Sequence, residues 1–165
     1  MGSEMCIRDR FTDADETVST NEDTVLTGSV LTGTSSVDGP VTVTGFSVAG
    51  IAGSFTAGQT ANIAGIGTLV INANGSYTFT PAANYNGPVP VVTYTMTDGS
   101  SGDTSTLTIS VTPVDDPFTD DNETVSTNED TTLTGSVLTG TTSVDGPVTV
   151  TGFSIAGIAG SFTAG

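Results

Sequence analysis

The sequence has no histidine and no tryptophan, and its only cysteine, Cys6, and both of its basic residues, Arg8 and Arg10, lie in the first ten positions. After residue 10, a serine or threonine hydroxyl therefore has no histidine, lysine or cysteine to activate it, and zinc has none of its usual nitrogen or sulfur ligands. Two carboxylates can catalyse glycoside hydrolysis, but the cleft that binds the sugar usually contains aromatic residues on which the sugar rings stack, and the sequence has no tryptophan. We therefore predict that the chain is not an enzyme.

Positive charge is scarce throughout. The chain has eighteen acidic residues, and only Glu4 and Asp9 belong to the first ten positions, so the rest of the chain is acidic without compensation. Such a surface repels nucleic acid and anionic lipid, which are bound through Lys and Arg. No apolar run reaches the ~18 residues of a membrane span. We expect neither nucleic-acid binding nor membrane insertion. Two readings of the carboxylates stay open, namely cation binding and plain solubility.

What the sequence does contain is a repeat. Residues 118–165 reproduce residues 11–58 at an offset of 107. The two copies differ at Ala14/Asp121, Asp15/Asn122, Val25/Thr132, Ser35/Thr142 and Val48/Ile155. This predicts a tandem array with one complete unit, 11–117, and the truncated start of a second, 118–165, in a piece of a longer protein. Residues 1–10 precede the repeat and resemble a translated sequencing adapter, so we interpret them as a spurious tail.

The repeat has the period-two pattern of β-strands. Apolar residues alternate with threonine or serine along Val92–Thr97 and Thr106–Val111, which is typical of strands with one buried face. Asn74-Gly75 predicts a hairpin turn, and the apolar residues change parity near Gly45, which predicts a bulge. About seven strands are expected, near residues 17–20, 25–30, 41–48, 69–72, 76–80, 91–97 and 104–114. The predicted fold is an all-β, antiparallel, immunoglobulin- or cadherin-like β-sandwich.

This register predicts which side chains are buried. The expected core residues are Phe46, Tyr77, Phe79, Tyr94, Leu107 and Ile109, and the expected exposed residues are Thr78, Thr95 and Thr108. Of the two valines that differ between the copies, Val25 is expected to face outward and Val48 to face the core. In residues 118–165 the partner sheet is missing, so Leu133, Val150, Phe153 and Ile155 are expected to be uncovered. We favour 11–117 as the folded unit, with exchange between chains as a hazard.

An acidic joint separates the two copies. Pro113 and Pro117 end the last strand, and five carboxylates lie between Asp115 and Glu123. In a seven-strand sandwich the first turn and the last strand finish at the same end, which places Glu22 beside the joint. Oxygen-only ligands suit calcium, which takes six to eight of them. The expected ligands at the joint are Glu22, Asp23, Asp115, Asp116, Asp120, Asp121 and Asp145. A merely solvated acidic linker is the alternative.

Four segments in order, 16–24, 67–87, 94–99 and 111–117, resemble bacterial cadherin-like repeats, the tandem extender modules of large repetitive RTX-type surface adhesins. The resemblance implies a sandwich with calcium-rigidified linkers, neighbouring repeats of the same chain as partners, and a spacing role in cell adhesion or biofilm. It also implies type I secretion and an extracellular, cell-surface location.

By residue, the resemblance implicates the Glu22-Asp23 pair, Asp98 in the Asp98-Gly99 loop, and the Asp115-Asp116-Pro117 linker. The loop 34–38 departs from the family pattern, because many relatives carry several aspartates where this sequence has only Asp38. The adhesion ligand is not identified by the sequence.

Outward-facing threonines support a second hypothesis. Rows of threonine are similar to those of some ice- or carbohydrate-binding surfaces, so a ligand-binding module is the alternative function. Ordinary strand propensity explains the same threonines. A flat, regularly spaced threonine ladder would favour binding, whereas a twisted and interrupted one would favour the spacer.

Overall fold

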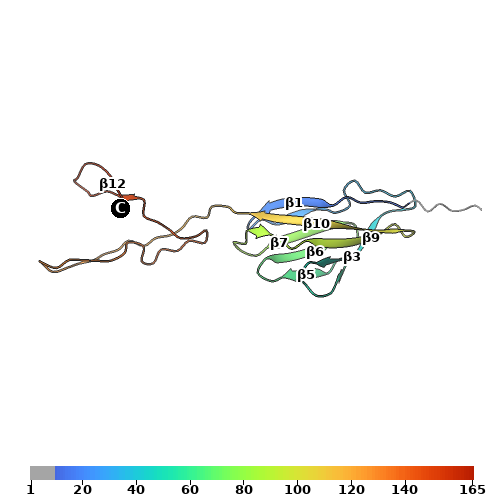
Figure 1. Cartoon of the computed structure of the whole chain (residues 1–165), viewed down its shortest axis with the longest axis horizontal. Helices are drawn as coiled ribbons and strands as arrows, with labels where there is room; N and C mark the ends of the chain where they lie inside the picture. The colour runs from blue at the N-terminus through green and yellow to red at the C-terminus, as the bar shows by residue number, and fades with distance from the viewer. Residues whose placement is uncertain (1–9) are drawn as a thin grey trace, which may run out of the picture. The chain divides into compact units, whose positions relative to one another are not determined.

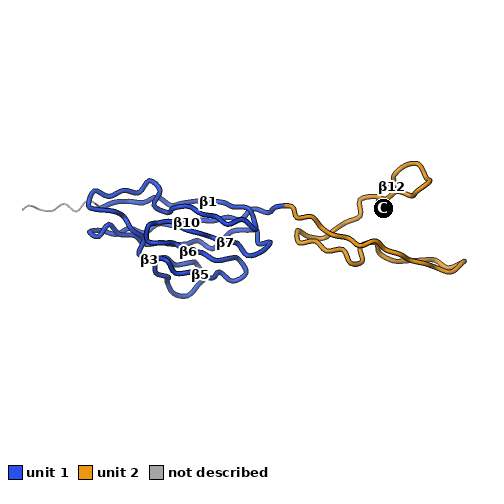
Figure 2. Tube along the Cα trace, turned by 180° about the vertical axis from the view of Figure 1, so that it is seen from behind, with its two compact units in different colours: residues 1–114 blue, residues 115–165 orange. Residues whose placement is uncertain are grey.

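The computed structural model describes residues 10–165, which fall into two compact units, residues 10–114 (unit 1) and Asp115–Gly165 (unit 2) (Figures 1 and 2). Of the predicted tail, only Arg10 lies within the described residues. The boundaries 11–117 and 118–165 remain predictions, and the structural division falls between Val114 and Asp115.

Unit 1 is a sandwich of two sheets. One sheet has the order β1 (Glu16–Asn21), β10 (Gly102–Thr112), β9 (Val92–Thr97), β3 (Thr42–Val48) and β4 (Phe55–Thr56), with β8 (Gly87–Pro88) also paired to β10. The other has the order β2 (Leu26–Ser29), β7 (Ser76–Pro81), β6 (Gly67–Ile71) and β5 (Thr60–Ile63). The predicted all-β sandwich is confirmed. One pair departs from the antiparallel prediction, because β1 runs parallel to β10.

The core lies between the two sheets and follows the predicted register. All six residues expected in the core are buried, namely Phe46, Tyr77, Phe79, Tyr94, Leu107 and Ile109. Val48 is buried and Val25 is exposed, as predicted from the two copies. Thr95 is exposed, but Thr78 and Thr108 are half-buried, so the outer face is less open there than expected.

The local predictions near Gly45 and Asn74 are also confirmed. The β3–β9 register shifts between Val43 and Gly45, which is the expected bulge. The β6–β7 hairpin turns at Asn74-Gly75, where Gly75 has a φ of 83° and Asn74 Oδ1 accepts a hydrogen bond from the Ser76 amide.

Strands β5 and β8 of unit 1 were not predicted. Strand β5 alternates like the others, but its inward residues are only Ala61 and Ile63, so its apolar signal is weak. Strand β8 has two residues and includes Pro88, which lacks an amide hydrogen and is tolerated in a short edge strand.

Unit 2 has little regular structure within residues 115–165. Its strands are β11 (Gly152–Phe153) and β12 (Phe162–Thr163), which pair with each other, and an isolated bridge joins Thr119 to Thr142. Leu133, Val150, Phe153 and Ile155 are all exposed. The expected lack of a covering sheet for these four residues is therefore seen.

Candidate calcium ligands and the two ends of the sandwich

Unit 1 has two ends, defined by its parallel pair. At the exit end, β1 and β10 finish side by side, with Asn21 opposite Thr112. At the entry end, β9 finishes at Thr97 and β10 begins at Gly102. Strand β10 has eleven residues, so at ~3.3 Å per residue the ends are over 30 Å apart. Glu22 and Asp23 follow β1 at the exit end, whereas Asp98 lies at the entry end and cannot share an ion with them.

Glu22 holds three segments of the exit end together through hydrogen bonds. Its amide donates to the Thr112 carbonyl at 2.9 Å, and its buried carboxylate accepts the Val114 amide at Oε1 (2.5 Å). The other carboxylate oxygen, Oε2, accepts the Asn86 side-chain amide at 3.2 Å. The carboxylate therefore joins the turn after β1, the end of β10 and the loop before β8. Each carboxylate oxygen has a second lone pair, so this arrangement leaves capacity for a cation.

Asp23 is exposed beside Glu22 and contacts the same loop. Its Oδ1 accepts the Asn84 amide at 3.0 Å, and Asp23 and Asn84 both have a φ of 55°. Asp and Asn tolerate this left-handed conformation better than other non-glycine residues. Sequence reasoning missed Asn84 and Asn86 as part of this end. The available signal was two asparagines in the short polar run 84–87.

Asp98 at the entry end already has four hydrogen-bond donors. Its Oδ2 accepts the hydroxyls of Ser36 (2.6 Å) and Ser101 (3.1 Å), and its Oδ1 accepts the amides of Ser100 (2.8 Å) and Ser101 (2.7 Å). These bonds, with that from the Ser36 hydroxyl the strongest influence, hold the pKa of Asp98 far below its ordinary value. The ionised carboxylate ties the β2–β3 loop to the β9–β10 loop.

A carboxylate cluster that the sequence did not predict surrounds Tyr94. The hydroxyl of this fully buried tyrosine lies 2.6 Å from Asp13 Oδ2 and 3.2 Å from the Val30 carbonyl, and it also contacts a Glu16 carboxylate oxygen. Burial is the largest cause of the raised pKa of Tyr94, and the Asp13 and Glu16 carboxylates raise this pKa further. Burial likewise raises the pKa of Glu16, although its hydrogen bond from Tyr94 acts in the opposite direction.

The same segment is fixed to the start of β10. The Asp13 amide donates to Asp103 Oδ2 at 3.1 Å, and the Thr106 amide donates to Asp15 Oδ1 at 2.8 Å. The signal that was available is Tyr94 itself, because a buried tyrosine hydroxyl needs a polar partner and Asp13 to Glu16 are rich in carboxylates.

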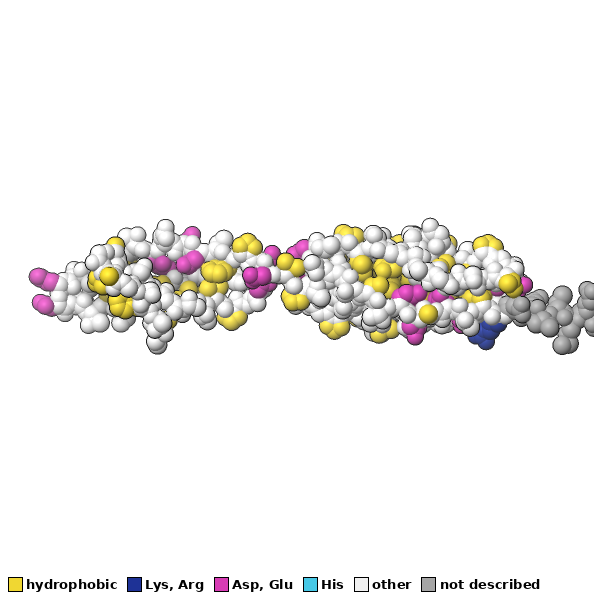
Figure 3. Space-filling view, turned by 90° about the horizontal axis from the view of Figure 1, so that it is seen from above, with side chains coloured by type: hydrophobic (Ala, Val, Ile, Leu, Met, Phe, Trp, Pro, Cys, Tyr) yellow, Lys and Arg dark blue, Asp and Glu magenta, His cyan; other side chains and the backbone are white. Residues whose placement is uncertain are grey.

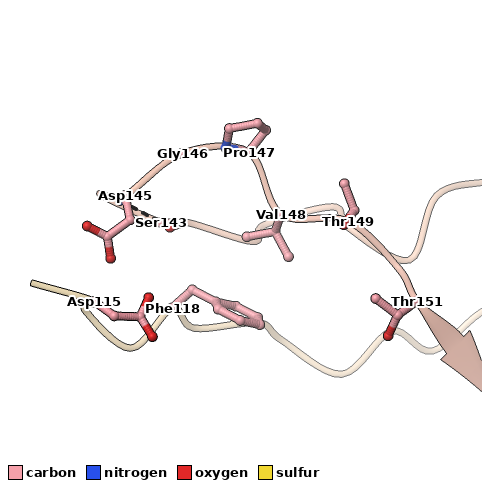
Figure 4. Close-up of a pocket in the computed structure, with 9 residues that line it drawn as sticks. All are labelled: Asp115, Phe118, Ser143, Asp145, Gly146, Pro147, Val148, Thr149 and Thr151. Carbon is pink, nitrogen blue, oxygen red and sulfur yellow. Dashed lines mark hydrogen bonds between the residues drawn. The ribbon is translucent and has the colours of Figure 1, made fainter. Parts of the chain in front are cut away.

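Unit 2 brings some of its predicted ligands together. Asp115 and Asp145 line an open groove of about 470 Å³ with Phe118, and their carboxylates face one another across it (Figure 4). Asp145 Oδ2 also accepts the Asp116 amide at 2.5 Å. Elsewhere in the unit, Asp120 accepts the Thr141 hydroxyl, and Asp121 lies near Gly140.

The donor chemistry of these groups fits calcium, because every available ligand is an oxygen. Acidic side chains are distributed over both units, whereas the basic group lies at the start of the described residues (Figure 3). Within residues 10–165, no three acidic, histidine or cysteine side chains are grouped so as to hold a metal ion. Each unit contributes acidic pairs and not a complete coordination sphere. The eight-residue ligand set therefore stays a prediction.

Fold and site together define an immunoglobulin-like structural module, a β-sandwich whose two ends are fastened by carboxylate hydrogen bonds. The family model of the bacterial cadherin-like domain matches residues 9–113, and the chain belongs to this family. Such domains are typically non-enzymatic structural modules, occur in extracellular and surface proteins, and generally bind calcium. A search of curated proteins found no match. No helix in the described part of the chain has the length and apolar character to cross a membrane.

Proposed function

We propose that this chain is part of a tandem array of spacer repeats in a bacterial surface adhesin, where it extends the protein away from the cell. The observation that carries the proposal is the position of the two termini of unit 1. The chain is fastened at the entry end through Asp13 and Asp103, and it leaves at the exit end through Val114, which Glu22 holds. A domain that the chain enters at one end and leaves at the other adds its full length to an array.

The calcium part of the proposal rests on chemistry and on the family. Glu22 and Asp23 lie at the exit end beside the start of the joint, and the joint itself continues with Asp115, Asp116, Asp120 and Asp121. Without a cation these carboxylates repel one another. Calcium bound at this joint would stiffen the linker, and the partners would be neighbouring repeats. Type I secretion and a role in adhesion or biofilm belong to the same proposal.

Limited proteolysis of a protein with two complete repeats tests the calcium joint. Calcium is expected to slow cleavage within residues 113–123 and to lengthen the protein in small-angle scattering, whereas magnesium at the same concentration has a smaller effect. The double variant Asp115→Asn, Asp116→Asn is expected to lose most of this protection, with unit 1 equally stable in chelator. Identical cleavage rates and dimensions in calcium and in chelator would refute the stiffened joint.

The threonine face gives the alternative, a carbohydrate- or ice-binding module, less support. The bulge between Val43 and Gly45 interrupts the register of β3 against β9. The Thr44 and Thr95 hydroxyls lie 2.9 Å apart and bond each other, so they are partly engaged within the sheet. An interrupted ladder favours the spacer.

A further inference from the structure

The hydroxyl group of Tyr94 is surrounded by more acceptors than it has protons to donate. Asp13 Oδ2 lies 2.6 Å from the hydroxyl oxygen, the Val30 carbonyl oxygen lies 3.2 Å from it, and a Glu16 carboxylate oxygen is in direct contact with it. A tyrosine hydroxyl donates one hydrogen bond, so a bond to Asp13 leaves no proton for Glu16. Two carboxylates at one such site cannot both stay ionised without a large electrostatic cost.

No basic side chain among residues 10–165 offsets this charge at Tyr94. Arg10 is the only Lys or Arg in that range, and it pairs with Asp103 at 3.6 Å. The contacts are also too close for a metal ion between the oxygens. Asp13 Oδ2 and the Tyr94 hydroxyl oxygen are 2.6 Å apart, whereas oxygens of different residues that each bind calcium at about 2.3–2.6 Å stand further apart. A proton therefore fits between these oxygens better than a cation.

The other hydrogen-bond donors indicate which carboxyl group holds the proton. Asp13 accepts the Thr34 hydroxyl at Oδ1 and the Tyr94 hydroxyl at Oδ2, and such donors favour an ionised carboxylate. Among the described residues, Glu16 has only Tyr94 and its own amide as donors. Burial raises the pKa of Glu16 most, and the charges of Asp13 and Asp15 raise it further. Glu16 is therefore the group that binds the proton.

We propose that Glu16 is a carboxylic acid in folded unit 1, that it donates its proton to the Tyr94 oxygen while Tyr94 donates to Asp13, and that loss of this proton releases residues 11–15 from the sandwich. Residues 11–15 are called the entry segment. With the proton bound, each hydrogen in the series from Glu16 to Asp13 has one acceptor. Without it, Glu16 and Asp13 repel each other across the Tyr94 oxygen.

The groups around Glu16 come from both sheets. Tyr94 belongs to β9, whereas Tyr77 belongs to β7 of the other sheet. The pKa of Tyr77 is raised by burial first and by the Glu16 charge second, so both tyrosines stay neutral where carboxyl groups titrate. A Cβ at Gly28 of β2 would lie 2.5 Å from the Tyr77 hydroxyl oxygen, so glycine at this position makes room for the ring. Neither tyrosine supplies a charge that could replace the proton.

The remaining charged neighbour of the entry segment is Asp103 in β10. Its pKa is lowered, first of all by a hydrogen bond from the Thr104 amide, so it stays ionised while Glu16 titrates. Asp103 Oδ2 accepts the Asp13 amide at 3.1 Å, and this bond reports whether the entry segment is in place.

The position of Glu16 in the chain limits how far the release extends. Glu16 is the first residue of β1, where it lies opposite Leu107, and the entry segment before it belongs to no strand. That segment is held by the buried ring of Phe11, by the Asp13 amide, and by the Ser105 hydroxyl, which donates to the Asp13 carbonyl at 3.2 Å. Loss of the proton is therefore expected to open the entry segment and to leave the β1–β10 pairing in place.

Nuclear magnetic resonance of the whole chain tests the proposal from about pH 4 to about pH 8, where ordinary and raised carboxyl pKa values lie. The Glu16 carboxyl carbon is expected to titrate above the ordinary value of 4.5, and the Tyr94 ring signals should shift with it. As Glu16 loses its proton, protection of the Asp13 amide against hydrogen exchange is expected to fall at least several-fold. The Glu22 amide, bonded to the Thr112 carbonyl at the exit end, is the control and should keep its protection.

Matched variants separate a shared proton from a carboxyl group that is merely buried. Glu16→Gln, whose side-chain amide can also donate to Tyr94, is expected to keep the Asp13 amide protected across the pH range. Asp13→Asn removes the neighbouring charge and is expected to move the Glu16 titration toward 4.5. Asp38→Asn, at an exposed carboxylate of the entry end, is expected to change neither result.

Four outcomes would overturn the proposal. These are a Glu16 titration at or below 4.5, a proton held by Asp13 in place of Glu16, a Glu16 titration that Asp13→Asn does not move, and equal protection of the Asp13 amide before and after Glu16 titrates.

Discussion

Residues 11–58 and 118–165 share all but five of their 48 positions, yet they differ in how much regular structure they form. The short-range features occur in both copies, namely the hairpin with its stacked phenylalanines and the left-handed turn at Asp23 or Asp130. Strand β1 occurs only in the first copy, where β10 lies beside it. Turns and tight hairpins depend on residues that are close in sequence, whereas β1 needs a strand far away in sequence to pair with the hydrogen-bonding groups of its backbone.

Replacing the stacked phenylalanines by alanine, one copy at a time, is expected to show the largest difference in stability between the two copies. Phe46→Ala is expected to lower the free energy of unfolding by about 3–5 kcal/mol, because the ring is buried. Phe153→Ala is expected to cost less than about 1 kcal/mol, because its ring is half-exposed. Urea unfolding of the two variants measures both. Equal losses would mean that residues 118–165 share a core that the structure does not show.

Glu22 and its counterpart Glu129 offer a second comparison, with a smaller effect. Glu22→Ala leaves the Val114 amide and the Asn86 side chain without their acceptor, which is expected to cost about 1–3 kcal/mol. Glu129→Ala is expected to be close to neutral, because Glu129 is exposed. Hydrogen exchange at the Val114 amide should accelerate in the first variant only. Unchanged exchange at Val114 would show that Glu22 does not fasten the exit end.

Glu16, in the first copy, should make the stability of unit 1 depend on pH. Burial raises the pKa of Glu16 above its ordinary value of 4.5, so its contribution to stability is complete below that value and is lost as pH rises through the folded-state pKa. Stability is therefore expected to fall with rising pH above about 4.5, with a weaker fall in Glu16→Gln. Unfolding midpoints across this pH range measure the difference. Matching pH profiles for Glu16→Gln and the unmodified chain would contradict the prediction.

Asp98 should respond to acid with the opposite sign. Its hydrogen bonds, first of all that from the Ser36 hydroxyl, lower its pKa, so its contribution is present above the ordinary value of 3.8 and is lost as pH falls through the folded-state pKa. Asp98→Asn is expected to be less stable than the unmodified chain at neutral pH, and this difference should shrink in strong acid. A difference that is constant with pH would assign the loss to shape and not to charge. This is the smallest expected effect, because the loop lies at the edge of the sandwich.

The sequence predicted what depends on periodicity and turn chemistry. Alternation identified the strands that contain Tyr77, Phe79, Tyr94 and Leu107, and all four residues are buried. Strand β5 was not predicted, because the small side chain of Ala61 contributes little to the apolar pattern, although Ala61 is fully buried.

The candidate site was less predictable, because its contacts join distant parts of the chain. Asp13 and Tyr94 are 81 positions apart, and Glu22 and Val114 are 92 apart, so no local pattern connects them. Acidic residues could be assigned to an end of the sandwich from topology. Whether a given carboxylate is exposed, like Asp23, or already engaged by four donors, like Asp98, depends on loop geometry that has no sequence period.

The parallel pairing of β1 with β10 has a mechanical consequence. If the chain is pulled at both ends of unit 1, β1 is drawn toward the entry end and β10 toward the exit end. The six residue pairs from Glu16–Leu107 to Asn21–Thr112 are then loaded in shear, all at once, and do not peel apart one by one. Their backbone hydrogen bonds must break together, so the direction of pull resists rupture better than a hairpin pulled open from one end. A tether under fluid drag would carry tension along this resistant axis.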